Sequence, residues 1–263
     1  MLHVEHVSKT FFPGTINEKK ALQDLSLHLE PGDFATVIGG NGAGKSTTLN
    51  AIAGVFPIDK GKIIIDGEDI TKEPEHKRAK YIGRVFQDPM LGTAGMMIEE
   101  NLSLAARRGE TPGLGWSLSS DQHDRFYELL KELDLGLEDR MTAKVGLLSG
   151  GQRQALTLLM ATLKKPKLLL LDEHTAALDP KTAAKVLTLT EKIVTRDQLT
   201  TLMITHNMRD ALRYGNRLIM LHNGRVIIDV KGEEKQHLQI ADLLDMFEKA
   251  SGSEMASDRL LLG

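Results

Sequence analysis

Three observations predict an α/β fold with a phosphate-binding core, antiparallel strands at the N-terminal end and a helical segment inserted into the core. A glycine-rich stretch at 39–46 lies between a strand pattern and a helix pattern, which is the usual setting of a phosphate-binding loop. Strand and helix patterns alternate from residue 168 to residue 230, as they do in a parallel sheet covered by helices. Between residues 88 and 165, helix patterns replace strand patterns.

The N-terminal segment is predicted to form two antiparallel strands. Residues 2–7 and 25–29 alternate apolar and polar side chains, so each strand should expose one face. Between them, Phe11-Phe12-Pro13-Gly14 is predicted to be a loop with two adjacent aromatic side chains. An exposed Phe in this loop could stack on an adenine ring, or both could anchor an N-terminal hairpin, and these residues alone favour neither interpretation.

The phosphate-binding loop has two glycines five residues apart, followed by lysine and serine. Residues 34–38 are an apolar run rich in β-branched side chains, which predicts a buried strand, and residues 46–53 predict a helix. Glycines let backbone N–H groups close around phosphate oxygens, and the positive end of the helix adds to the attraction. We expect Lys45 to reach the β- and γ-phosphates and the Ser46 hydroxyl to bind Mg²⁺.

The remaining patterns divide the chain into a core and a lobe. Further strands are predicted at 62–66, 81–86, 168–171, 200–204, 217–222 and 226–230. Further helices are predicted at 98–107, 121–133, 151–163, 181–196, 207–214 and 239–250. We therefore expect one domain over 1–250, with a core at about 1–87 and 166–235, a helical lobe at about 88–165, a C-terminal helix at about 239–250 and a flexible tail at 251–263. The loop at 109–120, which holds Trp116, is given no role.

Two acidic residues follow a run of four leucines at 168–171. A fully buried strand that ends in two carboxylates delivers them to the carboxyl edge of the sheet, where phosphate-binding loops also lie. Asp172 is therefore expected to hold Mg²⁺, directly or through water, and Glu173 to polarise an attacking water molecule.

A second glycine-rich helix start occurs at Leu148-Ser149-Gly150-Gly151-Gln152, which opens a helix running to Leu163. Ser149 is a good N-cap, and the two glycines expose backbone N–H groups at the positive end of the helix. The chain thus has two phosphate-cradling devices, although one nucleotide needs only one. The simplest interpretation is that the second device serves a nucleotide held by another copy of the chain.

The bulk composition excludes several classes of protein. The net charge of −3 argues against binding nucleic acid through a basic surface. The lack of cysteine excludes disulfides and fits the cytosol. The first residues lack the pattern of a signal peptide, and no apolar run approaches the ~20 residues that span a bilayer. We expect a soluble chain whose membrane role, if it has one, comes through a partner.

The motifs together resemble those of the ATP-binding-cassette (ABC) ATPases, and the resemblance covers nearly the whole chain. The segment 148–152 is similar to that family's signature sequence, and it is highly specific when combined with the segments 39–46 and 168–173. The resemblance implies the ABC ATPase fold, with a phosphate-loop nucleotidase core, an N-terminal antiparallel β subdomain and an inserted α-helical subdomain. It also implies that the chain binds and hydrolyses ATP with Mg²⁺.

The resemblance assigns roles to single residues. Those expected to contact the nucleotide are Phe11 (with Phe12 as its rival), Gly39, Asn41, Gly42, Ala43, Gly44, Lys45, Ser46, Thr47, Ser149, Gly150, Gly151 and Gln152. Those expected to act in catalysis are Glu173, His206 and Gln87, and those expected to bind the metal are Ser46, Gln87 and Asp172. Gln87 would link the nucleotide to the helical lobe, and the loop Ala177-Leu178-Asp179 would cross a dimer. His206 would contact the γ-phosphate.

One residue departs from the family pattern. After Glu173 the family usually has proline, and this chain has His174. We expect the backbone to be freer there, and none of the chemistry assigned above uses the His174 side chain.

The resemblance further implies that two cassettes pair head to tail around two ATP molecules, the second being another copy or a paralogous cassette. We expect the ATPase of a bacterial importer, at the inner face of the cell membrane, with an integral-membrane permease as partner and an extracellular substrate-binding protein as an indirect one. Segment 172–179 resembles that of a bacterial group associated with amino-acid-type substrates, aromatic ones among them. The apolar residues Pro89, Met90, Leu91, Met96 and Met97 could receive a permease helix or form lobe core. The alternatives are a soluble cassette, for example in cluster assembly, and an exporter subunit.

Overall fold

The strands form two sheets in the computed structural model, which describes residues 1–88, 94–110 and 120–251. The smaller sheet is antiparallel and has the order β2-β1-β4-β5. Its strands are β1 (Leu2–Phe11), β2 (Lys19–Leu29), β4 (Lys60–Ile65) and β5 (Glu68–Asp69). The larger sheet has the order β10-β9-β3-β8-β7-β6 and is parallel except for β10. Its strands are β3 (Phe34–Ile38), β6 (Ile82–Val85), β7 (Leu168–Asp172), β8 (Thr200–Ile204), β9 (Arg217–His222) and β10 (Arg225–Lys231).

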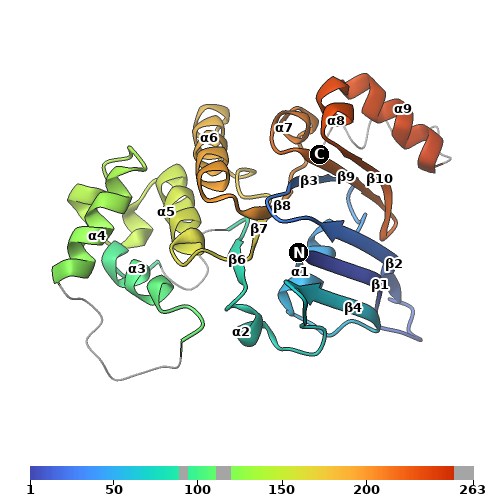
Figure 1. The fold of residues 1–263 in the computed structure, drawn as a ribbon, viewed down its shortest axis with the longest axis horizontal. Coiled ribbons are helices and arrows are strands. Elements are labelled where there is room, and N and C mark those ends of the chain that lie inside the picture. The colour runs from blue at the N-terminus through green and yellow to red at the C-terminus, as the bar shows by residue number, and fades with distance from the viewer. Residues whose placement is uncertain (89–93, 111–119, 252–263) are drawn as a thin grey trace.

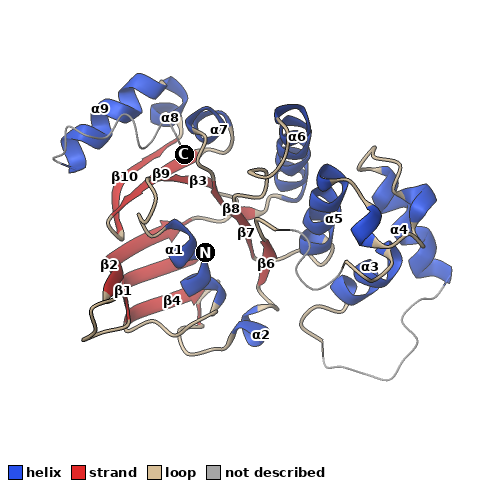
Figure 2. Ribbon diagram, turned by 180° about the vertical axis from the view of Figure 1, so that it is seen from behind, coloured by secondary structure: helices blue, strands red, loops and turns tan. Residues whose placement is uncertain are grey.

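The helices cover this sheet and build a separate lobe (Figure 1). They are α1 (Lys45–Ala53), α2 (Glu75–Arg78), α3 (Ile98–Ala106), α4 (Ser120–Lys131), α5 (Gly150–Thr162), α6 (Pro180–Asp197), α7 (Met208–Arg213), α8 (Glu233–His237) and α9 (Ile240–Ser251), with short 3₁₀ turns at Glu138–Arg140 and Val145–Leu147. Helices α3, α4 and α5 form the lobe beside β6 and β7, and Figure 2 shows the same arrangement from behind. The lobe has its own apolar core, which includes Leu102, Phe126 and Leu130.

Strand β7 shows why the larger sheet is apolar on both faces. Leu168 and Leu170 face a core shared with α1 and the antiparallel sheet, whereas Leu169 and Leu171 face a core shared with α5 and α6. All four leucines are fully buried. A parallel strand covered on both sides is expected to be a continuous apolar run, and this run predicted β7 correctly.

The N-terminal strands are longer than the sequence pattern predicted. Strand β1 continues to Phe11, so Phe11 ends a strand and does not lie in a loop. The register of β1 against β2 shifts between Val4 and Val7, where His6 has a φ of 50°. Such a bulge puts successive side chains out of the simple alternation, and the pattern of apolar and polar residues therefore stopped at residue 7.

The parallel strands bring the ends of distant segments to one edge of the sheet. The loop after β3 leads into α1, β7 ends at Asp172, and β8 ends two residues before His206. The carboxyl edge of such a sheet is where open α/β folds bind ligands. At the other end of the chain, α9 packs Leu243 and Phe247 on the core, and the residues after 251 lie outside the described part of the chain.

Candidate nucleotide site

The loop between β3 and α1 needs glycine at specific positions. Gly39 has a φ of 150°, and a Cβ atom there would lie 2.3 Å from the carbonyl oxygen of Leu221. At Gly44, which precedes α1 with a φ of 103°, a Cβ atom would lie 2.9 Å from the carbonyl oxygen of Ala21. The loop is therefore held against neighbouring backbone on two sides, in a conformation that L side chains rarely adopt.

Lys45 is turned back into this loop. Its ammonium donates to the carbonyl oxygen of Gly39 at 2.7 Å and, more weakly, to that of Gly40 at 3.4 Å. The side chain is only 8% exposed, and burial lowers its pKa, while the carboxylates of Glu173 and Asp172 act in the opposite direction. A buried ammonium with two neutral acceptors gains from a stronger one, such as a phosphate oxygen.

The hydroxyl of Ser46 and the carboxylate of Asp172 lie together, with Oγ 3.2 Å from Oδ1. A hydroxyl and a carboxylate oxygen are ligands that Mg²⁺ prefers, usually together with phosphate oxygens and water. These two residues therefore fit the metal that the resemblance implied. The other carboxylate oxygen of Asp172 lies 3.7 Å from Nη2 of Arg84, which donates to Oδ1 of Asn50.

Glu173 and His206 face each other across the same edge, with 4.0 Å between Oε2 and Nδ1. Glu173 has a φ of 44°, and its backbone N–H donates to the carbonyl oxygen of Ile204 at 3.2 Å. The ends of β7 and β8 thus fix both residues. An acid beside a histidine at a phosphate-loop edge can orient water and contact a terminal phosphate.

Gln87 follows β6 and lies between the core and the lobe. It shares a cavity of about 550 Å³ with Asp172, His174 and Gly150. The carboxylate of Asp172 and the exposed Gln87 thus line the same space, although no hydrogen bond joins them among the residues described.

The second glycine-rich segment forms the capped start of α5. Oγ of Ser149 accepts from the backbone N–H of Gln152 at 3.3 Å, and Oε1 of Gln152 accepts from that of Ser149 at 3.1 Å. This reciprocal pair is a capping box. A Cβ atom at Gly151 would lie 2.3 Å from Cγ2 of Thr182 on α6, so close packing explains that glycine.

The structure separates this helix start from the phosphate-binding loop. In both views α5 belongs to the lobe, and β6 and β7 lie between it and α1 (Figures 1 and 2). Among the residues described, no hydrogen bond or ion pair joins 149–152 to 39–47. Lys45, Ser46, Asp172, Glu173 and His206 therefore form one group. Segment 149–152 lies outside it, although Gly150 lines the cavity that Asp172 and Gln87 share.

The two candidates for adenine stacking differ in their surroundings. Phe11 lies edge-on to Phe56, with 5.1 Å between ring centroids, and Nζ of Lys9 lies 5.6 Å from the Phe11 ring. Phe12 is 66% exposed and has a φ of 52°. The Phe11 ring is half-buried, whereas the Phe12 ring is exposed. Which of the two stacks on adenine stays a prediction.

His174 differs from the expectation of a freer backbone. Its side chain is buried, and Nε2 lies 3.1 Å from Oγ1 of Thr190 on α6. Burial lowers the pKa of His174 to about 4, so the imidazole is neutral at physiological pH. Residue spacing does not predict this contact with Thr190, which lies sixteen residues further along the chain.

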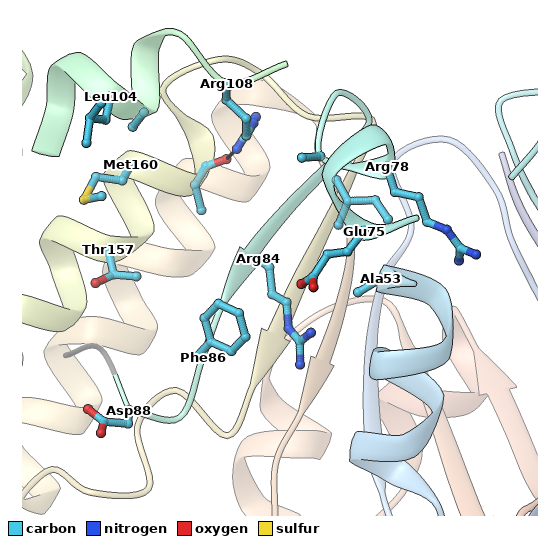
Figure 3. Close-up of a pocket in the computed structure, with 14 residues that line it drawn as sticks. Ala53, Glu75, Arg78, Arg84, Phe86, Asp88, Leu104, Arg108, Thr157 and Met160 are labelled. Atoms are coloured by element: carbon cyan, nitrogen blue, oxygen red, sulfur yellow. Dashed lines mark hydrogen bonds between the residues drawn. The ribbon is translucent and has the colours of Figure 1, made fainter. Parts of the chain in front are cut away.

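A further cavity, of about 440 Å³, opens where the core meets the lobe (Figure 3). Arg84 of β6 and Phe86, the first residue after that strand, form one side, and Leu104, Thr157 and Met160 of the lobe form the other. Nε and Nη1 of Arg84 are buried there without a hydrogen-bond partner in the described residues. Sequence reasoning missed Arg84, because a single arginine in a strand pattern carries no signal of its surroundings.

Comparison with known proteins defines the class. The family model for the ABC transporter matches residues 22–176. The chain belongs to the ABC transporter family, and it is a nucleotide-binding ATP hydrolase with the predicted ABC ATPase fold.

Two relatives and one solved structure are similar to the chain over most of its length. The chain is 47% identical over 252 residues to the tyrosine transport ATP-binding protein of Clostridioides difficile (strain R20291), covering 95% of this chain and 100% of that protein. It is 36% identical over 210 residues to the thiamine import ATP-binding protein ThiQ of Salmonella choleraesuis (strain SC-B67), covering 80% and 85%. A dimeric ATP-binding cassette solved in a post-hydrolysis state with ADP and phosphate matches with a TM-score of 0.75 at 30% identity, covering 88% of this chain and 98% of that one.

Among the described residues, no helix is both long enough and apolar enough to span a membrane.

Proposed function

We propose that this chain is the ATP-binding and hydrolysing subunit of a bacterial importer, which dimerises around two ATP molecules with Mg²⁺ and powers uptake through a separate permease. The observation that carries the proposal is the pairing of Ser46 with Asp172 at 3.2 Å, beside the buried Lys45. Hydrolysis of a nucleotide needs a phosphate-binding ammonium and a metal site at one place, and this edge of the sheet holds both kinds of group.

Within one chain, each group at this edge has a task. Lys45 and the N–H groups of the loop 39–47 bind the phosphates, and Asn41, Gly42, Ala43 and Thr47 belong to that loop. Ser46 and Asp172, with Gln87 opposite, would hold Mg²⁺, which neutralises phosphate charge when bound. Glu173 orients and deprotonates the attacking water, and His206 contacts the γ-phosphate.

The dimer follows from the two separate phosphate-cradling devices. The N–H groups at the start of α5 lie at the positive end of the helix dipole, where a phosphate can bind. However, β6 and β7 lie between these groups and α1. A second copy turned head to tail would bring Ser149, Gly150, Gly151 and Gln152 to the nucleotide held by Lys45 of the first. The similarity to a cassette solved as a dimer supports this arrangement.

The permease would dock in the cavity of Figure 3. Leu104 is 57% exposed there, and Met160 adds apolar surface. Arg84 and Arg108 line the same cavity. A permease segment with apolar side chains and a carboxylate would complement the apolar and the basic parts of this lining. Of the residues first considered for this contact, Met96 is half-buried, Met97 is 36% exposed, and Pro89, Met90 and Leu91 lie outside the described residues.

The direction and the substrate of transport rest on the relatives. Two of them are named for tyrosine transport and thiamine import. The higher identity is to the tyrosine protein, so we propose an amino-acid-type substrate such as tyrosine, delivered to the permease by an extracellular binding protein. The chain would then act in the cytoplasm, at the inner face of the cell membrane.

Co-expression with the membrane protein encoded beside this chain tests the proposal. We expect the two to co-purify and to show ATP-dependent tyrosine uptake in vesicles, and Arg84→Met to weaken co-purification. A chain that hydrolyses ATP but is recovered without a membrane protein would instead favour a soluble cassette. ATP-dependent efflux from vesicles would favour an exporter.

A further inference from the structure

We propose that His174 is a positioning residue, which holds the catalytic Glu173 in place through a hydrogen bond to Thr190 of helix α6. The inference rests on the proposed role of Glu173. It assigns a task to a residue that stands where the family usually has proline, and that the chemistry described above does not use.

Glu173 needs such a restraint because of its backbone. It is the first residue after β7, and its φ of 44° lies in the left-handed region. A residue other than glycine stays in this region only when the surrounding structure holds its backbone in place. One restraint is the hydrogen bond from its N–H to the carbonyl oxygen of Ile204 at 3.2 Å. A second restraint on the backbone of Glu173 can come from the following residue, His174.

The structure fixes residue 174 by its side chain. His174 is 2% exposed, and Nε2 lies 3.1 Å from Oγ1 of Thr190. The Thr190 hydroxyl donates its proton to the carbonyl oxygen of Val186 at 2.8 Å. It therefore accepts from His174, whose proton is on Nε2. Because Thr190 is fully buried in α6, the helix serves as a rigid anchor.

The position of the ring links this anchor to the site. His174 lines the same cavity as Asp172 and Gln87, so it lies between α6 and the residues proposed to bind the metal. Loss of the hydrogen bond would release the segment that carries Glu173, and it would leave the loop 39–47 untouched. We therefore expect a change in turnover with little change in nucleotide affinity.

Three variants separate positioning from packing. His174→Leu removes the donor, Thr190→Val removes the acceptor and keeps the shape, and His174→Gln keeps a terminal N–H donor at a similar reach. Thr188→Val is the matched control, because the hydroxyl of Thr188 also donates to its own helix, to the carbonyl oxygen of Ala184 at 2.9 Å, but is exposed. For each we would measure kcat, the dissociation constant for ATP and the melting temperature.

We expect His174→Leu and Thr190→Val each to lower kcat roughly tenfold or more, as displaced catalytic groups do. The ATP dissociation constant should stay within about twofold of the parent value, since Lys45 is unaffected. His174→Gln should recover most of the rate, and Thr188→Val should not differ from the parent. The double variant His174→Leu, Thr190→Val should be no slower than either single variant, because both remove one shared interaction.

Parent-like kcat in both single variants would overturn the inference, as would additive losses in the double variant. Equal falls in kcat, ATP affinity and melting temperature would assign His174 to packing alone. Glu173→Gln in the same assay distinguishes the two levels of the proposal. If Glu173→Gln hydrolyses ATP at the parent rate, the proposed function of that residue fails, whereas a dead Glu173→Gln with unaffected His174 variants removes only the inference.

Discussion

The hydroxyl of Ser46 and the carboxylate of Asp172 lie 3.2 Å apart, although 126 residues separate them in the chain. They meet because β3 and β7 run parallel on either side of β8 and end at the same edge of the sheet. The sheet itself therefore brings the two proposed metal ligands together. Such preorganisation reduces the cost of ordering the site on binding.

The buried Lys45 should be essential for nucleotide affinity. Its ammonium donates to the carbonyl oxygens of Gly39 and Gly40, and phosphate oxygens would be stronger partners. We expect Lys45→Ala to weaken ATP binding by about ten- to hundredfold, the usual value of a hydrogen bond to a charged group. Titration with a fluorescent ATP analogue measures this, with Lys131→Ala on an exposed position of the lobe as control. Equal affinities in the two variants would contradict the assignment.

Two adjacent glycines of the phosphate-binding loop should respond differently to alanine. A Cβ atom at Gly39 would lie 2.3 Å from a backbone oxygen at a φ of 150°, whereas none of the described atoms lies within 4 Å of one at Gly40. Gly39→Ala should therefore lose roughly 1–3 kcal/mol of stability through strain, together with ATP affinity. Gly40→Ala should stay within about 1 kcal/mol of the parent. Thermal unfolding with and without ATP compares the two, and similar losses would mean that the loop is not held as described.

The buried Lys235 should make stability depend on alkaline pH. Nζ donates to the carbonyl oxygens of Tyr214, Gly215 and Arg217, and burial lowers the pKa of Lys235 to about 8. Between pH 8 and the ordinary lysine pKa of 10.5, the unfolded chain binds more protons than the folded chain. The free energy of unfolding should therefore rise with pH across that window, by about 1–3 kcal/mol more than in Lys235→Met. Parallel pH curves for the parent and the variant, from urea unfolding, would refute this.

Removal of the charge of Glu173 should stop hydrolysis without preventing ATP binding. We expect Glu173→Gln to lose at least about a hundredfold in turnover, the usual contribution of a general base. ATP would then remain bound and hold two copies together, which light scattering would detect as a doubled mass in ATP and a single mass in ADP. A variant that turns over near the parent rate would remove Glu173 from its role.

The sequence could predict those features that depend on neighbouring residues. The order of glycines in 39–44 and the leucines before Asp172 each specify a local structure, and parallel pairing then brings the two together. The C-terminal end of β1 was missed because the bulge near His6 breaks the alternation on which strand prediction depends. The partner of His174 was missed because the contact depends on how α6 is rotated against β7, which residue spacing does not specify.

The most direct test of the account is the structure of Glu173→Gln with ATP and Mg²⁺. We predict a head-to-tail dimer in which Ser149 of one copy contacts the γ-phosphate of a nucleotide held by Lys45 and Ser46 of the other. Nucleotide bound at Lys45 with Ser149 far from every triphosphate, in all assemblies, would contradict the claim that each copy completes the site of its partner.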